Sequence, residues 1–163
     1  LACCLEENID EKDLTVYRGW PEPSGLLVSP SHPLAGKRLV TEQLLSGETL
    51  IVTEINSKYT MLLTEELEKA KVKPMRILEI ERLHAAKTFA KKGLGIAVLP
   101  LVAAQDEITK GSLCALDWSD TPWKMQAFMF HHKDKWLPAP LKLFMKLLWE
   151  RMPLSKEANK NER

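Results

Sequence analysis

The stretch KTFAKKGLGIAVLP, residues 87–100, predicts a helix, a stop and a buried strand in direct succession. Its first half has apolar residues at helical spacing, and two lysines place positive charge in the last turn. Gly93 can adopt the left-handed backbone conformation that ends a helix, and Gly95 lets the backbone pass close to a neighbour. Residues 96–99 form an apolar run, which is typical of a strand buried on both faces. This piece indicates a parallel sheet flanked by helices and favours ligand binding over catalysis.

The rest of the chain continues this alternation. The predicted strands are residues 1–5, 14–18, 26–29, 50–53, 75–80, 113–116 and 124–131. The predicted helices are residues 41–45, a helix capped by Asn56 or Ser57 and ending near residue 71, a helix ending at Lys92, and residues 101–108 and 141–151. Pro100 fits the first turn of the helix at 101–108, and residues 20–25 have the composition of a turn. The order of strands and helices across residues 50–99 predicts an α/β fold.

Composition narrows the class of protein. The chain has 163 residues, of which 45% are hydrophobic, and a net charge of +1. This near-neutral charge gives no electrostatic basis for nucleic-acid binding by the chain itself. No apolar run approaches the roughly 18 residues of a membrane span, and the first residues lack the features of a signal peptide, so we expect a cytoplasmic protein without membrane contact. The chain starts in LACCLEE without a methionine, and we interpret it as a fragment of a longer protein.

Residues that could carry catalytic chemistry are few and poorly spaced. The cysteines are Cys3, Cys4 and Cys114, and the histidines are His32, His84, His131 and His132. Neither set has the spacing of a metal site, and no nucleophile elbow is present. Gly93 and Gly95 lie between a helix and a strand, which is the reverse of the order that a dinucleotide-binding loop needs. We therefore expect no cofactor, no metal and no enzyme activity.

The ends of the predicted parallel strands are the candidate ligand site, because unpaired N–H groups of helix N-termini gather there. The residues that follow the three strands are Glu54, Asn56 and Ser57, then Glu81 and Arg82, then Pro100. Asn56 and Ser57 either cap their own helix or donate to a bound carboxylate. Arg82 is a directional partner for an anion, although a salt bridge with Glu79 or Glu54 would explain it equally well.

Several motifs together resemble a known family. They are LLVSPSHPLAG at residues 26–36, IVTE at 51–54, KGLGIAVLP at 92–100, GSLCAL at 111–116 and HHKDKW at 131–136. In this order and spacing they resemble the effector-binding domain of LysR-type transcriptional regulators. The resemblance covers roughly residues 1–152, and its motifs are specific together and weak singly.

The resemblance implies two Rossmann-like lobes of the periplasmic-binding-protein type II kind, with a small-molecule effector in the cleft between them. Residues 30–111 would form a complete second lobe, residues 1–29 and 112–152 a partial first lobe, and residues 153–163 a disordered tail. The N-terminal part of the first lobe would be missing, together with the winged helix-turn-helix through which such regulators contact DNA. The full-length protein would be a homodimer or homotetramer.

Effector contacts, again by resemblance, would fall on residues 54–57 and on Ile80, Glu81 and Arg82. The glutamates at these turns disfavour a small anion unless Arg82 or a bound cation offsets them. An extracytoplasmic solute-binding protein of an uptake system has the same architecture and is the alternative function. An enzyme on this scaffold is disfavoured, because no catalytic constellation is present.

Overall fold

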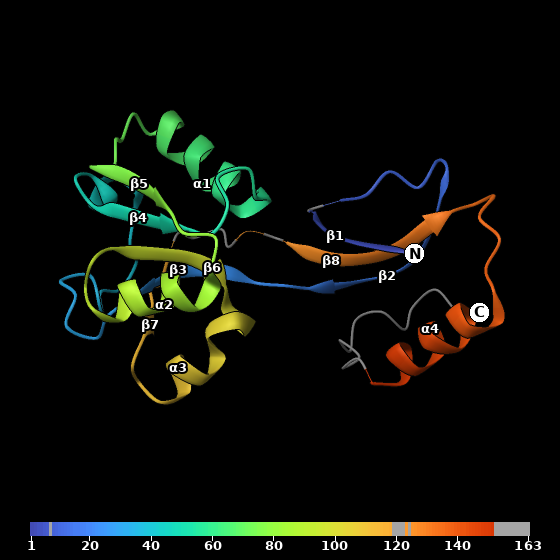
Figure 1. Cartoon of the computed structure of the whole chain (residues 1–163). Helices are drawn as coiled ribbons and strands as arrows, with labels where there is room; N and C mark the ends of the chain where they lie inside the picture. The colour runs from blue at the N-terminus through green and yellow to red at the C-terminus, as the bar shows by residue number, and fades with distance from the viewer. Residues whose placement is uncertain (7, 119–122, 124, 152–163) are drawn as a thin grey trace. The chain divides into compact units, whose positions relative to one another are not determined.

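The computed structural model describes residues 1–6, 8–118, 123 and 125–151 of the chain, which separates into two compact units (Figure 1). One unit consists of Glu22–Met125, and the other combines Leu1–Pro21 with the chain from Gln126 onward. Within the described ranges, no helix is long and apolar enough to cross a membrane.

The larger unit contains a five-stranded sheet in the order β5-β4-β6-β3-β7. Its strands are β3 (Ser24–Val28), β4 (Thr49–Val52), β5 (Arg76–Glu79), β6 (Ile96–Pro100) and β7 (Cys114–Ala115). β4 is parallel to both β5 and β6, whereas β3 is antiparallel to β6 and β7. The sheet therefore has the predicted parallel centre, with two antiparallel strands added on one side.

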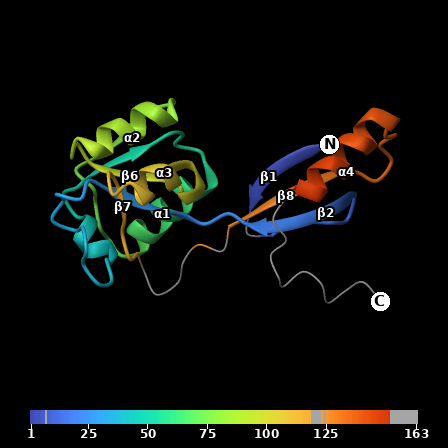
Figure 2. The same ribbon diagram turned by 90° about the horizontal axis from the view of Figure 1, so that it is seen from below.

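Helices cover both faces of this sheet. They are α1 (Lys58–Lys69), α2 (Leu83–Lys91) and α3 (Gln105–Thr109), with 3-10 turns η1 (Glu42–Leu45) and η2 (Leu101–Ala104). The connections β4–α1–β5 and β5–α2–β6 run in opposite directions along the sheet, so α1 and α2 lie on opposite faces when both crossovers are right-handed (Figure 2).

β6 lies at the centre of the core, as its apolar sequence predicts. All four side chains from Ile96 to Leu99 have 0% exposure, which requires cover on both faces of the strand. Ala86 and Ala90 of α2 are also fully buried in the cluster that includes Ala97 and Leu99. Their small side chains allow the helix to approach the sheet closely.

The two glycines before β6 have the conformations that the sequence predicts. Gly93 has φ +73° directly after the end of α2, which is the left-handed region. A Cβ on Gly95 would lie 2.5 Å from the carbonyl oxygen of Thr49, so the backbone passes against β4 at this position. Glycine is required at Gly93 for backbone conformation and at Gly95 for space.

The prediction of one continuous helix at residues 101–108 that starts with Pro100 is wrong in its start and in its continuity. Pro100 is the last residue of β6, not a residue of the first helical turn, and η2 and α3 follow it. The cause is a long-range bond: the Leu101 N–H donates to the carbonyl oxygen of Pro23 at 2.8 Å, which continues the pairing of β6 with the β3 side. The turn predicted at residues 20–25 is shorter for the same reason, since β3 begins at Ser24.

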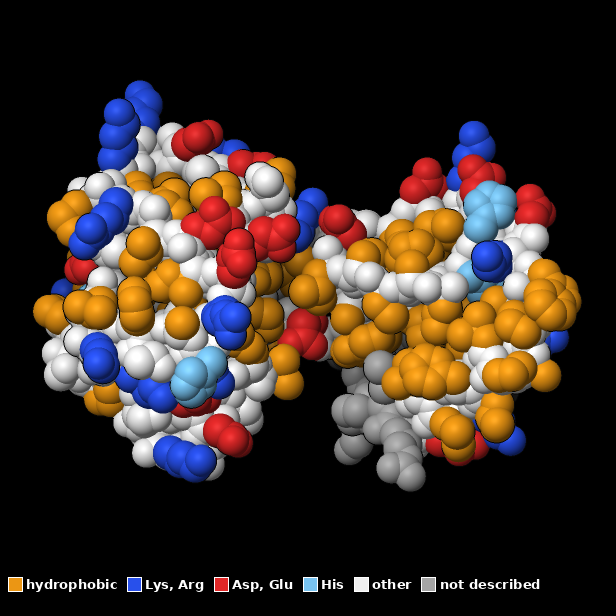
Figure 3. Space-filling model, in the orientation of Figure 1, with side chains coloured by type: hydrophobic (Ala, Val, Ile, Leu, Met, Phe, Trp, Pro, Cys, Tyr) orange, Lys and Arg blue, Asp and Glu red, His pale blue; other side chains and the backbone are white. Residues whose placement is uncertain are grey.

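The smaller unit is an antiparallel sheet in the order β1-β8-β2, with helix α4 (Figure 1). Its elements are β1 (Ala2–Glu6), β2 (Leu14–Pro21), β8 (Gln126–His132) and α4 (Ala139–Arg151). Met129 of β8 is fully buried, and His131 is buried with its Nε2 hydrogen-bonded to the hydroxyl of Tyr17. α4 buries Met145, whereas Leu143, Phe144 and Leu147 of its apolar stripe are about half exposed (Figure 3).

The larger compact unit extends beyond residues 30–111, the range predicted for one lobe. It includes β3 before that range and β7 just after it, because both strands pair within the five-stranded sheet. The division into a complete second lobe and a partial first lobe stays a prediction. The predicted tail at residues 153–163 lies outside the described residues.

Trp123 is hydrogen-bonded to a carboxylate of α1, and its ring lies beside that of Trp118. The Nε1–H of Trp123 donates to Oε1 of Glu66 at 3.0 Å, and the rings of Trp118 and Trp123 lie 6.4 Å apart. Both tryptophans are only 8% exposed. Burial raises the pKa of the Glu66 carboxyl, and the hydrogen bond from Trp123 opposes this shift. Trp123 is two residues from the boundary of the unit at Met125.

The two glycines give a test of the turn into β6. We expect Gly93→Ala to destabilise the protein by about 1–2 kcal/mol, since the new Cβ has open space but an unfavourable φ. Gly95→Ala should cost more, because its Cβ would overlap a backbone oxygen that cannot swing away. Urea denaturation measures both changes, and an equal cost for the two variants would contradict this account.

Glu66 gives a test of the tryptophan contact. Since the pKa of Glu66 is raised in the folded state, its stabilising contribution is present below the unfolded-state pKa and is lost as pH rises through the folded-state pKa. Glu66→Gln, which retains an acceptor for Trp123, should therefore gain stability relative to the wild type between acidic and neutral pH. Glu66→Leu should lose about 1–3 kcal/mol, because a buried indole N–H loses its partner. Denaturation followed by tryptophan fluorescence measures the stability of both variants. If the wild type instead became more stable relative to Glu66→Gln as pH rises, the folded state would prefer the ionised carboxylate.

Candidate functional site

The turn between β4 and α1 is the first part of the candidate site. Ser57, one of the two predicted capping residues, is the N-cap residue of α1, but its side chain does not cap the helix. Its Oγ–H instead donates to the carbonyl oxygen of Glu54 at 2.9 Å, and the same oxygen accepts from the Ser57 N–H at 3.2 Å. The Ile55 N–H donates to Oε1 of Glu79 at 3.0 Å. The turn is thus closed by its own hydrogen bonds and by a carboxylate from β5, while Asn56 is exposed.

The turn between β5 and α2 is the second part. The Ile80 N–H donates to the carbonyl oxygen of Val52 at 2.8 Å, which ties this turn to the end of β4. Arg82 is the N-cap residue of α2 and is exposed, as is Glu81. Among residues 1–6, 8–118, 123 and 125–151, no salt bridge joins Arg82 to Glu79 or Glu54. The alternative explanation of Arg82 as a structural ion-pair partner therefore has no support in this structure.

The third part lies where β6 ends and β3 begins. Pro100 is paired with Ser24 in the antiparallel register of these strands. One carboxylate oxygen of Glu22 and the hydroxyl of Ser24 are buried and have no hydrogen-bond partner among the described residues. Burial raises the pKa of Glu22. These two polar groups were missed, since their segment was interpreted as a turn, and a carboxylate between two prolines gave the only signal.

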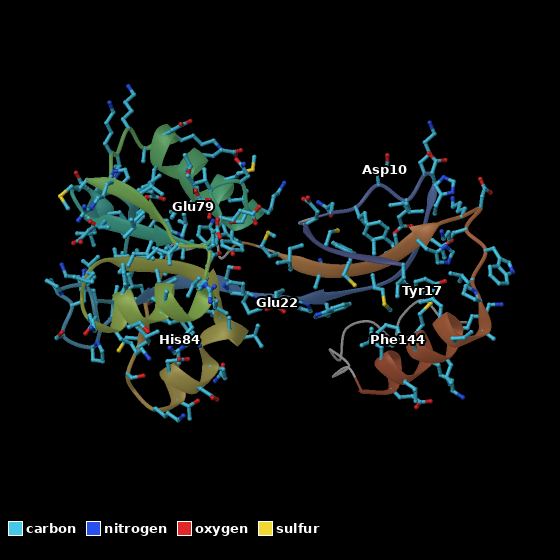
Figure 4. All side chains as sticks on the ribbon, in the orientation of Figure 1. Asp10, Tyr17, Glu22, Glu79, His84 and Phe144 are labelled. Atoms are coloured by element: carbon cyan, nitrogen blue, oxygen red, sulfur yellow. The ribbon has the colours of Figure 1, made fainter. Side chains whose placement is uncertain are left out.

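The three parts meet at one edge of the sheet, because β4 is the parallel neighbour of both β5 and β6. The bonds from Ile55 to Glu79 and from Ile80 to Val52 hold the first two turns together, and Glu79 is labelled at this end of β5 in Figure 4. The structure places all predicted site residues at this edge: Glu54, Asn56, Ser57, Ile80, Glu81, Arg82 and Pro100. Their role in binding a ligand stays a prediction.

A partly buried ion pair fixes the helix that carries Arg82. Nζ of Lys87 in α2 lies 2.9 Å from Oε1 of Glu107 in α3 and donates to the carbonyl oxygen of Ala103 at 2.9 Å. The hydrogen bond from Lys87 holds the pKa of Glu107 below its ordinary value. α2 is therefore joined to α3 and η2 by directional bonds as well as by apolar packing. This arrangement keeps the N-terminus of α2 in place at the site.

The exposed side chains of the first two turns are rich in oxygen acceptors. Glu54, Glu79 and Glu81 are exposed beside a single arginine, Arg82. Acidic side chains also gather over this unit in the space-filling view (Figure 3). In the described part of the chain, no group of three or more His, Cys, Asp or Glu residues could hold a metal ion. The edge is suited to hydrogen bonding with a small polar molecule.

Two regulators of Bacillus subtilis (strain 168) are similar in sequence. The chain is 42% identical over 71 residues to the uncharacterized HTH-type transcriptional regulator YwqM, which is 43% of this chain and 24% of the regulator. It is 31% identical over 110 residues to the uncharacterized HTH-type transcriptional regulator YybE, which is 66% of this chain and 38% of that protein. The chain thus spans well under half the length of either relative.

Solved regulatory domains have the same fold. The regulatory domain of CcmR from Synechocystis PCC6803, in complex with 2-PG, has a TM-score of 0.75 at 24% identity, and the match covers 91% of this chain and 72% of that one. The regulatory domain of MetR from N. meningitidis, a LysR family regulator, has a TM-score of 0.72 at 19% identity, and the match covers 91% of this chain and 71% of that one. The effector binding domain of QuiR in complex with shikimate has a TM-score of 0.68 at 14% identity, and the match covers 88% of this chain and 68% of that one.

The α/β fold predicted from the sequence is therefore the fold of LysR regulatory domains, of the periplasmic-binding-protein type II kind. The family described as LysR substrate binding domain matches residues 2–153, nearly the whole chain. This protein belongs to the LysR substrate-binding domain family.

Proposed function

We propose that the chain is the effector-sensing domain of a LysR-type transcriptional regulator. The observation that carries this proposal is the family match over residues 2–153, on a sheet whose three parallel strands end at one polar edge. Two related structures are complexes with the small molecules 2-PG and shikimate, which supports a small polar effector for this chain as well. The relatives in Bacillus subtilis are HTH-type regulators, which favours this function over an extracytoplasmic solute-binding protein.

The effector would contact the two turns that follow β4 and β5. Asn56 and Arg82 are exposed at these turns and are the side chains best suited to bind it. Ser57 is closed onto its own turn, and Ile80 uses its N–H internally, so these two would contribute contact surface. Glu54 and Glu81 would accept hydrogen bonds, and Pro100 would provide an apolar wall at the third strand.

Regulation would follow from a difference in effector affinity between two conformations of the full-length protein. An effector shifts an equilibrium only by its differential binding to the two states. In a homodimer or homotetramer, such a shift would change the placement of winged helix-turn-helix domains on DNA. A regulator of this kind works in the cytoplasm, needs no cofactor and is not an enzyme.

The first test concerns DNA. We expect this chain alone to show no sequence-selective retention of promoter DNA in a gel-shift titration at low salt, because its net charge is +1 and it carries no recognition-helix pattern. The positive control is the full-length regulator on the same DNA. Selective retention by the chain alone would mean that DNA contacts lie within this domain.

The second test concerns the effector turns. Compounds that raise the melting temperature of the protein are first identified in a thermal-shift screen of small polar metabolites, and their affinity is measured by calorimetry. Arg82→Ala should lose roughly 1.5–3 kcal/mol of binding if its guanidinium contacts the ligand directly. Asn56→Ala should weaken binding less, by about 0.5–1.5 kcal/mol, since a neutral hydrogen bond is lost. Glu65→Ala, on the exposed side of α1, is the control. Unchanged affinity in both Arg82→Ala and Asn56→Ala would place the site elsewhere.

A further inference from the structure

Glu79 makes a bond that the motifs of the chain do not suggest. It is the last residue of β5, and its Oε1 accepts a hydrogen bond from the Ile55 N–H, 24 residues away in sequence, at 3.0 Å. β4 and β5 are paired with Val52 opposite Glu79, so the carboxylate reaches across from one strand end to the turn that follows the next. The bond therefore joins the two turns of the proposed effector site.

We propose that Glu79 is a positioning and specificity-determining residue of this site, an inference that rests on the function proposed above. Its carboxylate occupies the Ile55 N–H, which a bound anion would otherwise engage. Ile55 lies three residues before α1, so the negative charge of Glu79 also interacts favourably with the N-terminal end of that helix. The protein thus supplies this turn with its own anion.

Several neighbouring donors of the same turn are already paired with groups of the chain itself. The N–H and the Oγ–H of Ser57 both donate to the Glu54 carbonyl oxygen. The hydroxyls of Thr53 and Tyr59 are bonded to each other at 3.1 Å. Loss of the Glu79 carboxylate would add the Ile55 N–H to the donors that this turn can offer to a ligand. With Glu79 in place, the Ile55 position favours an effector group that donates hydrogen bonds, such as a hydroxyl, an amide or an ammonium, over a carboxylate.

The experiment uses acetate as the anion probe and the amide resonance of Ile55 as the reporter. Acetate is titrated into the 15N-labelled protein at neutral pH and low ionic strength, since salt screens such an interaction. Four proteins are compared: the wild type, Glu79→Ala, Glu79→Gln and the charge-matched control Glu65→Ala. Glu79→Gln retains an oxygen acceptor for Ile55 and loses the charge, so it separates the hydrogen bond from the electrostatic effect.

In Glu79→Ala we expect a saturable shift of the Ile55 amide with acetate, at an apparent affinity about tenfold higher than in the wild type. Glu65→Ala should behave as the wild type, and Glu79→Gln should retain the wild-type Ile55 resonance before acetate is added. An Ile55 amide that responds to acetate equally in the wild type and in Glu79→Ala would overturn the proposal, as would its silence in both. A turn that collapses on loss of Glu79 would shift Ile55 without acetate and leave no saturable response, which also counts against the proposal.

This measurement needs no identified effector. If the effector binds elsewhere, the acetate result still holds and only the assignment of the site is lost. If acetate fails to distinguish the variants, the effector test on Arg82 and Asn56 is unaffected. The two proposals can therefore fail separately.

Discussion

Complete burial of one short strand is the constraint on which the larger unit depends. β6 has no exposed side chain from Ile96 to Leu99, so it requires a strand on each side and cover on each face. Burial of such side chains contributes about 1.5–3 kcal/mol for each large one, which favours a single arrangement of neighbours. Gly95 allows β4 to approach, and the alanines of α2 allow the helix to approach. The polar edge exists because this packing aligns the carboxyl ends of β4, β5 and β6.

The local sequence pattern was enough to predict the end of α2 and a strand that is buried on both faces. An apolar run of four residues and a glycine after two lysines specify the end of α2 and the burial of β6 without knowledge of any partner. The end of β6 was not predictable in this way. Pro100 remains extended because the next residue bonds to Pro23, more than seventy residues earlier in the chain, and such pairing is invisible in a local window. Long-range bonds also decided the limits of β3.

At the candidate site, too, the positions of residues were predictable from local sequence and their hydrogen bonds were not. The positions of Asn56, Ser57 and Arg82 after their strands follow from the alternation of strands and helices. The hydrogen-bond partners of the polar groups do not follow from this alternation, because they depend on side chains that reach from one element to another. Asn56 or Ser57 was expected to cap α1, but the Ser57 hydroxyl bonds to the Glu54 carbonyl oxygen and the Thr60 hydroxyl. Glu79 was considered only as a partner for Arg82. The buried oxygens of Glu22 and Ser24, which have no hydrogen-bond partner in the described part of the chain, become visible only when the register of β3 and β6 is known.

β5 is the outer strand of the larger sheet, and its position has a consequence for solubility. An open strand edge exposes N–H and C=O groups that can pair with another molecule. β5 is only four residues long, begins with Arg76 and ends with Glu79, both exposed. Ionised side chains at both ends of so short a strand oppose addition of a further strand, since the incoming backbone would have to desolvate them. Glu79, at the polar edge of the sheet, thus also opposes edge-to-edge aggregation together with Arg76.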